Sequence, residues 1–410
     1  MLTRDAIGQR SETVRRSNLS AIVRALHLRG PLSRSELVAH TGLTRSAIRG
    51  LIGELVAGGL VTETPSVPAG TPGRPSPLVH PQPESAVVVA LEVNVDSLAV
   101  ARVGFGGSVD ELTRVDRPRA HVTVDEIVAD LVELAEPVLA TSPPEDVVGI
   151  GVAVAGVVRR TDGLVRLAPN LGWHDEPFGE RLSAALGVSL PLAVANEADL
   201  GGLAEHRRGA AIGERDVVYV TGEVGVGGNV VVDGQALVGA AGYAGEIGHM
   251  MVNPIGTACG CGSFGCWETE IGERAMLVRA GREAEGGREA VAELVAAATA
   301  GEPAALAGLA HVGNWLGIGL ASLINVFNPT LIVLGGIFGR IQPLIAADVR
   351  AVLERRALRA SRELVRVAPG SLGVDGPLIG AAELAFEPML ADPAARLVLV
   401  RSRRPVLASA

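Results

Sequence analysis

Residues 245–268 read GEIGHMMVNPIGTACGCGSFGCWE, and this stretch holds all three cysteines of the 410-residue chain. His249, Cys259, Cys261 and Cys266 follow the spacing H-x9-C-x-C-x4-C, which places four nitrogen and sulfur donors in one short loop. Such a donor set suits a closed tetrahedral zinc site, and the glycines between the cysteines let the backbone turn tightly. Because four protein ligands leave no position for water, the spacing predicts a structural Zn2+ ion. A free-thiol or redox loop is the alternative.

Two carboxylates flank this loop. Glu246 lies three residues before His249, and Glu268 lies two residues after Cys266. A bound metal would fix the loop, so that both carboxylates face a shared pocket. Rigidly held hydrogen-bond acceptors suit a polyhydroxy ligand such as a sugar. Either carboxylate alone would be read as a surface charge, but the pair beside a metal loop predicts a sugar site.

The region around this loop alternates between apolar runs and helical stretches. The clearest runs are AVVVALEV (86–93), VVGIGVAVAG (147–156) and LIVLGG (331–336). This alternation predicts an α/β architecture in which helices cover the sheets. Glycine-rich turns after such strands are common binding places for phosphates or small ligands, although a lone turn is weak evidence.

Composition places the chain in the cytoplasm. Three cysteines cannot all pair as disulfides, and the first 30 residues lack the layout of a signal peptide. The apolar segment 306–327 approaches the length of a membrane span, but it contains His311 and two asparagines and runs directly into a buried strand. It is therefore predicted to be a core helix, and no membrane partner is expected.

Charge separates the N-terminal region from the rest of the chain. Residues 1–80 contain ten arginines and five acidic residues, a net charge of +5. The whole chain carries −9, so the remainder carries −14. A basic head on an acidic body favours nucleic-acid binding at the N-terminus.

Three helical segments follow one another in this head. A first apolar period ends at Gly30, and Ser33 with Glu36 three residues later fits a capping box at the start of a second helix. After a turn at Gly42, Thr44 fits the cap of a third helix. Two short helices joined by a tight glycine turn predict a helix-turn-helix whose second helix enters the major groove.

The next stretch, residues 60–81, is rich in Pro, Gly, Ser and Thr. It fits a wing hairpin with Arg74 at its tip, although a plain linker would look much the same. Arginines suit phosphates and guanine edges, and one at a wing tip suits a minor groove. The residues expected to contact DNA are Ser33, Arg34, Thr44, Arg45, Ser46, Arg49 and Arg74. A helical interaction domain with a solvated arginine face is the alternative.

The motif GEIGHM…CGCGSFGCWE resembles the zinc-and-sugar signature of the ROK family, which combines bacterial sugar kinases with repressors that carry a winged helix before a kinase-like body. NVFNPTLIVLGG (325–336), APNLGW (168–173) and VANEADLGGLAEH (194–206) resemble its adenosine-side motif, its sugar-side loop and its catalytic segment. The resemblance implies a winged helix-turn-helix in front of a two-lobed, actin-like (RNase H-like) α/β fold, and a homodimer or homotetramer. It also implies that the sugar is held by Asn170, Asn196, Glu197, Glu246, His249 and Glu268.

Three departures from the family's kinase motifs predict that phosphoryl transfer is lost. In EVNVD (92–96), which replaces the D-x-G-x-T phosphate loop, Val95 stands where a glycine is needed and Asp96 adds a negative charge. In EVGVGGN (223–229), Glu223 and Val224 replace a Gly-Thr pair. Glu197 replaces the catalytic aspartate, and its extra methylene shifts the carboxylate by about 1 Å, which can cost on the order of 100-fold in rate. Phosphoryl transfer depends on positioning and on charge neutralisation.

The sequence thus predicts a sugar-responsive regulator, a repressor in the first instance, that binds double-stranded operator DNA and is not an enzyme. A sugar or sugar phosphate in the cleft between the lobes would change the spacing of two winged helices in an oligomer. The alternative is an active ATP-dependent sugar kinase that uses Glu197 as base and also binds DNA. A zinc-dependent hydrolase is disfavoured because the metal has no open position.

Domain boundaries follow from these assignments. The expected parts are a winged helix-turn-helix at 1–80 with wing or linker character from about residue 62, a first lobe at 85–195, a second lobe at 196–373 with the metal loop 249–266, a helix at 374–390 that returns to the first lobe, and a tail at 391–410. Whether the effector is phosphorylated stays open, because Arg159, Arg160 and Arg166 could serve a phosphate or be solvated.

Overall fold

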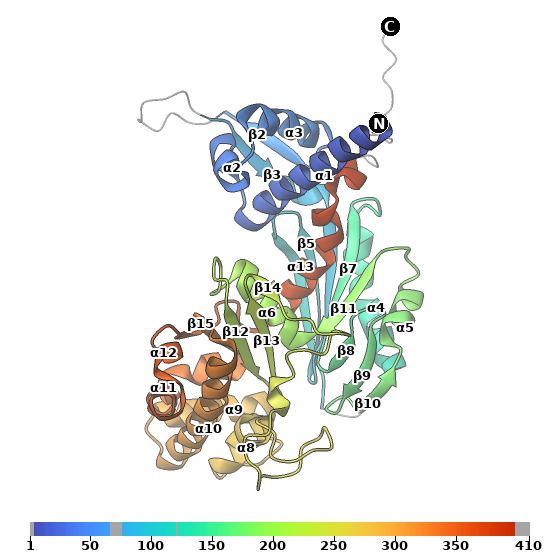
Figure 1. Ribbon diagram of the computed structural model, residues 1–410. Coiled ribbons are helices and arrows are strands. Elements are labelled where there is room, and N and C mark those ends of the chain that lie inside the picture. Colours follow the sequence, from blue (N-terminus) through green and yellow to red (C-terminus); the bar gives the residue numbers. More distant parts are fainter. Residues whose placement is uncertain (1–3, 66–75, 120–121, 398–410) are drawn as a thin grey trace.

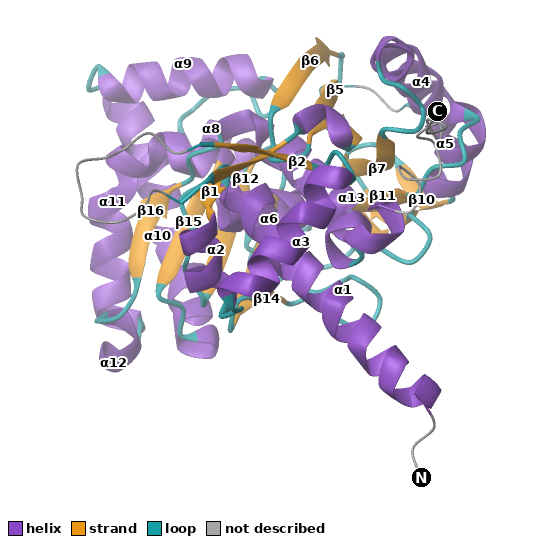
Figure 2. Ribbon diagram, turned by 90° about the horizontal axis from the view of Figure 1, so that it is seen from above, coloured by secondary structure: helices purple, strands orange, loops and turns teal. Residues whose placement is uncertain are grey.

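The computed structural model describes residues 4–65, 76–119 and 122–397 (Figure 1). Arg74 lies outside the described residues, so its predicted contact with DNA has no structural counterpart. Figure 1 shows a head at the top and two α/β lobes below it. In the view from above, the helices of the head lie over the junction of the two lobes (Figure 2).

A helix-turn-helix followed by a small sheet forms the head. Its elements are α1 (Arg4–Arg29), β1 (Leu32–Ser33), α2 (Arg34–Thr41), α3 (Arg45–Ala57), β2 (Val61–Thr64) and β3 (Leu78–Pro81). Both predicted caps are confirmed: Ser33 and Glu36 form a capping box on α2, and the Thr44 hydroxyl accepts the Ala47 N–H at 3.2 Å on α3. β2 and β3 pair antiparallel, which gives a wing hairpin. The two-residue strand β1 pairs with β3 and was not predicted, because two residues carry no periodic signal.

The first lobe is built on a five-stranded sheet of order β11-β7-β4-β5-β6. Its elements are β4 (Val87–Val93), β5 (Ser97–Gly104), β6 (Val109–Asp116), α4 (Val124–Thr141), β7 (Val147–Val154), α5 (Phe178–Leu186) and β11 (Leu192–Asn196). A side sheet holds β8 (Val157–Arg159), β9 (Leu164–Ala168) and β10 (Trp173–Glu176). Val89 and Leu91 share a core with α4, whereas Val88 and Ala90 face the last helix, α13 (Gly376–Ala391). The apolar run of β4, which only Glu92 interrupts, reflects burial on both faces.

The second lobe holds another five-stranded sheet, of order β14-β13-β12-β15-β16. Its elements are α6 (Glu197–Arg208), β12 (Val217–Gly222), β13 (Val226–Val232), β14 (Gln235–Ala236), the 3-10 turn η2 (Ile247–His249), α7 (Glu268–Ile271), α8 (Glu273–Arg279), α9 (Gly287–Thr299), α10 (Pro303–Phe327), β15 (Leu331–Gly335), α11 (Gly336–Arg356), α12 (Arg359–Arg362) and β16 (Arg366–Pro369). Val218 and Ile332 pack with α10 and α11 on one face, and α6 lies close to the other, where Gly201 meets the Tyr219 ring.

Helix α10 covers the apolar segment 306–327. By length and composition it is long and apolar enough to cross a membrane, and it is the helix among the described residues that meets this test. Many of its apolar side chains are nonetheless buried inside the protein: Leu316, Leu320 and Ile324 are 0 % exposed in the core shared with α11. Helix α10 is therefore packed in the core of the second lobe, as the sequence predicted.

The head meets the body at His27, in the last turn of α1. The buried ring lies between Phe105 and Phe386, with centroid distances of 5.6 and 4.7 Å. Its Nδ1 atom accepts the Gly106 N–H at 3.1 Å, so its Nε2–H donates to Glu383 Oε1, 3.2 Å away. Burial lowers the pKa of His27, which keeps the ring neutral at pH 7.

Glu383, on α13, joins this histidine to α6. Its carboxylate also accepts hydrogen bonds from Arg208 Nε at 2.6 Å and from Arg207 Nη1 at 3.3 Å. Burial alone would raise the pKa of Glu383, but the hydrogen bond from His27 and the charges of the two arginines outweigh burial and lower the pKa to about 2. The junction therefore contains an ionised carboxylate that is almost fully buried.

Glu387, one helical turn further along α13, forms a second ionic link between the head and the body. It binds Arg24 of α1 at 2.8 Å and also pairs with Arg207 of α6. Ser20 of α1 donates to the Leu390 carbonyl oxygen at 2.7 Å. Through α13, the head is thus fixed to the C-terminal end of α6.

Candidate functional site

The three cysteines and His249 come together in the loop after η2. Their four donor atoms all lie within 4.8 Å of one another. Cys259 Sγ is 3.7 Å from His249 Nδ1, and the Sγ atoms of Cys261 and Cys266 are 3.7 Å apart. All three cysteines are free of disulfides. Three thiols and one imidazole at these separations fit one tetrahedral ion, so the cluster could bind a metal.

The loop backbone depends on two of the three glycines between the cysteines. Gly265 has φ +66°, and a Cβ atom there would lie 1.8 Å from the Asn253 carbonyl oxygen. Gly262 has φ +90°, which is also left-handed. Gly260 has an ordinary φ, so its place in the motif does not come from backbone freedom.

Glu268 lies against the metal cluster. Its Oε1 atom is 2.8 Å from Cys259 Sγ and 3.7 Å from His249 Nδ1. A Cβ atom placed at Gly225 would lie 3.3 Å from Glu268 Oε2 and 3.9 Å from Asn170 Nδ2, so these two side chains approach the same point. The predicted residues Asn170, His249 and Glu268 therefore share one neighbourhood.

Glu246 belongs to the same neighbourhood, because the charge of Glu268 acts on its carboxyl group. Burial, followed by the negative charges of Asp199 and Glu268, raises the pKa of Glu246 to about 7. The carboxyl group is therefore present in both protonation states near neutral pH. It can accept a hydrogen bond from a hydroxyl group when ionised and donate one when protonated.

Asn196 has a structural use that limits what it can offer a ligand. Its Oδ1 atom caps α6 by accepting the N–H groups of Ala198 at 2.7 Å and Asp199 at 3.2 Å. Its Nδ2 atom donates to the Gly156 carbonyl oxygen at 2.8 Å. One N–H of the amide is left for a ligand.

Asp199 was missed by the sequence reasoning. It is 4 % exposed and accepts hydrogen bonds from Arg160 Nη2 at 3.0 Å and Asn229 Nδ2 at 3.2 Å. The signal available in the sequence was weak: the acid follows the cap of α6 by three residues, on the face of the helix that turns inward. Asp199 lies near Glu246, whose pKa it helps to raise.

Glu197 lies in a second neighbourhood, made of carboxylates. Burial, followed by the negative charges of Glu223, Glu92 and Asp96, raises the pKa of Glu197 to about 8. Burial also raises the pKa of Glu223 to about 7. A carboxyl group with a pKa of about 8 is mostly protonated at pH 7, whereas a general base must be ionised to accept a proton.

Ion pairs between the lobes occupy the region next to these carboxylates. Asp96, in the turn between β4 and β5, forms ion pairs with Arg119 at 3.0 Å and with Arg288 of α9 at 2.8 Å. Arg119 also forms two bonds with Glu273 of α8, the longer at 2.9 Å. From the sequence, Asp96 was predicted to add a negative charge that repels ATP. In the structure its charge is instead matched by two arginines.

The predicted phosphate motif EVGVGGN also has a different role. A Cβ atom at Gly227 would lie 2.4 Å from Ala198 Cβ, and one at Gly228 would lie 2.1 Å from Ile247 Cδ1. These glycines let β13 approach α6 and η2 closely. Their presence follows from packing, whether or not a nucleotide binds.

In the head, the predicted DNA contacts divide into two groups. Arg45, Ser46 and Arg49 are exposed along the N-terminal half of α3, where their side chains can meet a partner. The hydroxyl groups of Ser33 and Thr44 act as caps, and Arg34 donates from Nε to Glu63 Oε1 at 2.6 Å.

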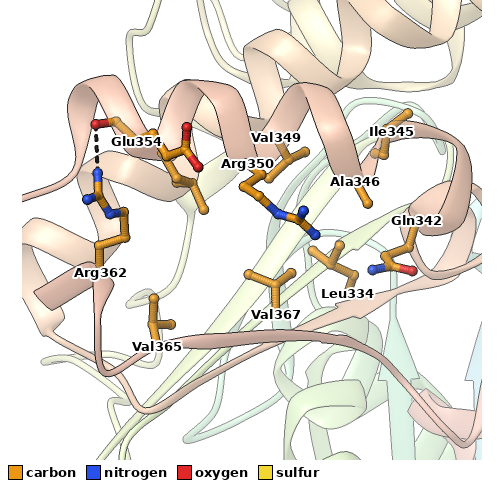
Figure 3. A pocket seen from close by; sticks show the side chains of 11 residues that line it. Leu334, Gln342, Ile345, Ala346, Val349, Arg350, Glu354, Arg362, Val365 and Val367 are labelled. Atoms are coloured by element: carbon orange, nitrogen blue, oxygen red, sulfur yellow. Dashed lines mark hydrogen bonds between the residues drawn. The ribbon is translucent and has the colours of Figure 1, made fainter. Parts of the chain in front are cut away.

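A cavity of about 360 Å³ lies elsewhere, between α11 and β16 (Figure 3). Aliphatic side chains form most of its wall, and Arg350 reaches across it. At its rim, Arg362 Nη1 donates to the Glu354 carbonyl oxygen at 2.6 Å. None of the predicted ligand residues lines this cavity, so the cavity does not coincide with the predicted sugar site.

Some known proteins match nearly the whole of this chain, and others match about three quarters of it. The model of the ROK family matches residues 88–387. The xylose repressor of Bacillus spizizenii is 26% identical over 381 residues, covering 92% of this chain and 97% of the relative. The glucokinase of Streptomyces coelicolor is 29% identical over 319 residues, covering 74% of this chain and 98% of the relative.

A solved structure extends the likeness to the whole fold. The crystal structure of a ROK family transcriptional regulator, described as a homologue of the Escherichia coli Mlc protein, has a TM-score of 0.77 at 24% identity and covers 94% of this chain and 99% of its own. The predicted fold, a winged helix-turn-helix before a two-lobed actin-like body, is confirmed. The kinase match covers a shorter share of the chain than the repressor match does.

Proposed function

Because the chain belongs to the ROK family, we propose that it is a cytoplasmic, sugar-responsive repressor that binds double-stranded operator DNA through its head. The observation that carries this proposal is the extent of the likeness, which with the xylose repressor includes the head and with the glucokinase spans about three quarters of the chain. The exposed side chains of Arg45, Ser46 and Arg49 on α3 support it. Domain limits at about residues 80, 195 and 373 belong to the same proposal, as does a homodimer or homotetramer.

At the metal loop we propose a structural Zn2+ ion held by His249, Cys259, Cys261 and Cys266. With four protein donors, the ion would supply rigidity and no catalytic water. Glu268 contacts two of these donors, so a fixed loop also fixes its carboxylate. The proposed sugar-binding residues are Asn170, Asn196, Glu197, Glu246, His249 and Glu268.

Helix α6 offers the route from the sugar to the head. Its first turn carries Asn196 as cap and Glu197, and its last turn carries Arg207 and Arg208, which bind Glu383 of α13. Twelve residues of α-helix span about 18 Å. A small rotation of α6 on sugar binding would therefore displace the carboxylate that anchors α1. In an oligomer this would change the spacing of two recognition helices on DNA.

The test of DNA binding is to select an operator from genomic fragments and to measure affinity by fluorescence anisotropy with and without sugar. Changing both Arg45 and Arg49 to alanine is expected to lower affinity for the selected operator by at least about tenfold, because phosphate and base contacts are lost together. Arg359→Ala, in α12 of the second lobe, is the matched control. Equal affinity of the double variant and the control would rule out α3 as the recognition helix.

The remaining candidate, an active sugar kinase, is favoured by the likeness to the glucokinase. We expect no turnover above background with ATP and hexoses or pentoses, because Glu197 is largely protonated at pH 7. In addition, Arg119 and Arg288 form ion pairs with Asp96. A coupled ADP-release assay at pH 7 checks this. Turnover at roughly 1–100 s⁻¹, as in ordinary kinases, would show that the protein is an enzyme.

A further inference from the structure

The cavity between α11 and β16 differs from the packing beside it. Its volume is about 360 Å³, yet Ile345, Val349 and Leu353 on its wall are buried members of the second-lobe core. Protein interiors contain few voids larger than a water molecule, so a hollow of this size is not ordinary core packing. Pockets that bind small molecules measure about 300–1,000 Å³ and have mostly apolar walls with a few polar groups. This cavity has both properties.

The position of the cavity explains why it is open to a ligand. β16 ends the second sheet and pairs with β15, so the cavity lies at a sheet edge. Side chains of α11, β15 and β16 form the wall, and Arg362 of α12 stands at the rim. Ala346 of α11 contributes only a methyl group to this wall, where a longer side chain would fill part of the space.

Two polar side chains in the cavity lack partners. Figure 3 shows Arg350 extending from α11 across the aliphatic wall near Leu334 and Val367, with Gln342 on the same helix. In the described part of the chain, the Arg350 guanidinium has no carboxylate partner and the Gln342 side-chain amide has no hydrogen-bond partner. A guanidinium presents parallel N–H donors that match the two oxygens of a carboxylate. Arg350 is therefore available to an anionic ligand.

The surface around the cavity mouth is basic, unlike the rest of the body. Residues 350–366 contain six arginines and two glutamates, a net charge of +4, whereas residues 81–410 together carry −14. Two of these arginines form ion pairs with glutamates, but Arg355 and Arg356 are exposed on α11. A local positive field raises the concentration of anions at the mouth. Charge and shape thus favour the same kind of ligand.

The wall sets how much charge that ligand can carry. Its aliphatic side chains require an apolar body, because they cannot replace the hydration of a second charged group. Glu354 also lines the cavity and would repel a further negative charge. These features favour a ligand with one carboxylate over a phosphate ester or a nucleic acid.

We propose that this cavity is a second ligand site, which binds a small amphipathic carboxylate such as a medium-chain fatty acid or an arylalkanoic acid. Arg350 and Gln342 receive the carboxylate, and the apolar body lies between α11 and β16. The site is separate from the metal loop, so the proposal goes beyond the response to sugar.

The test is isothermal titration of the full-length protein with octanoate and phenylpropionate, each compared with the alcohol of the same carbon skeleton. At least one carboxylate is expected to bind saturably, with its alcohol weaker by at least about tenfold, because hydrogen bonds to a charged group are lost. Failure of both carboxylates to saturate below about 1 mM would overturn the proposal, as would equal affinity of acid and alcohol.

A charge variant tests the assigned anchor. Arg350→Gln should weaken binding of the carboxylate by about tenfold and leave the alcohol unchanged, so that the difference between them disappears. Arg355→Gln removes an exposed charge of the same helix that does not line the cavity, and it should keep most of the difference. Equal effects of the two variants would show that the carboxylate is held only by the general positive field.

Two further variants test the location. Ala346→Leu fills part of the cavity and should weaken binding of both acid and alcohol, with an unchanged melting temperature as the check on folding. Glu268→Ala, at the metal loop, should bind the carboxylate as the parent protein does. Loss of carboxylate binding in Glu268→Ala but not in Ala346→Leu would place the ligand at the metal loop and refute the second site.

Discussion

Replacing Cys259 by serine is expected to abolish binding of the proposed Zn2+ ion and, with it, the response of the protein to sugar. Cys259 is one of four donors within 4.8 Å, and its Sγ atom lies 2.8 Å from Glu268. Loss of an outer-shell partner already lowers metal affinity by about 10–100-fold, so loss of a ligand should cost more. Without the ion, the carboxylate of Glu268 would no longer be held by a fixed loop, and sugar affinity should fall by at least about 100-fold.

Metal content by mass spectrometry and sugar titration of the same preparation measure both effects. Ser263→Ala is a matched control, because it changes a side chain of the same loop without removing a donor. Operator binding in the absence of sugar should persist in Cys259→Ser, since Leu19, Ile48 and Ile52 of the head pack in a core shared with the first lobe and α13, which does not include the metal loop. A variant that lost its metal but kept its sugar affinity would show that Glu268 is positioned by the rest of the fold.

The features that could be predicted from sequence are those whose signal is local. The Ser33–Glu36 capping box, the Thr44 cap and the metal loop each lie within about 20 residues of chain, and their chemistry fixes their spacing. Pairs distant in sequence could not be predicted. Asp96 meets Arg288 across 192 positions, and no pattern in either segment points to the other.

This difference matters for function because the distant pairs change what the local motifs mean. From sequence, Asp96 was a charge that keeps ATP out, and Arg160 was a possible phosphate ligand. In the structure, both form ion pairs, with Arg119 and Arg288 in one case and Asp199 in the other. These ion pairs are a property of the assembled lobes and not of any one motif.

Changing Glu383 to glutamine is expected to leave sugar affinity within about threefold of the parent protein and to abolish the release of operator by sugar. The glutamine oxygen can still accept the Nε2–H of His27, so the buried ring keeps its partner. Arg207 and Arg208, however, lose the buried carboxylate that joins α6 to α13. Breaking a buried ion pair by removing one partner costs about 3–5 kcal/mol, so the ionic link between α6 and α13 at Glu383 is expected to be lost while their apolar packing remains.

Operator affinity with and without saturating sugar gives the coupling directly, because coupling is the ratio of the two affinities. Glu363→Gln, an exposed partner of Arg359 on α12, should keep the full ratio. Glu387→Gln should reduce the ratio less than Glu383→Gln, since Glu387 is only half-buried and Arg24 and Arg207 stay near solvent. If Glu383→Gln binds sugar and still releases DNA as the parent protein does, the signal reaches the head by a route other than α6 and α13.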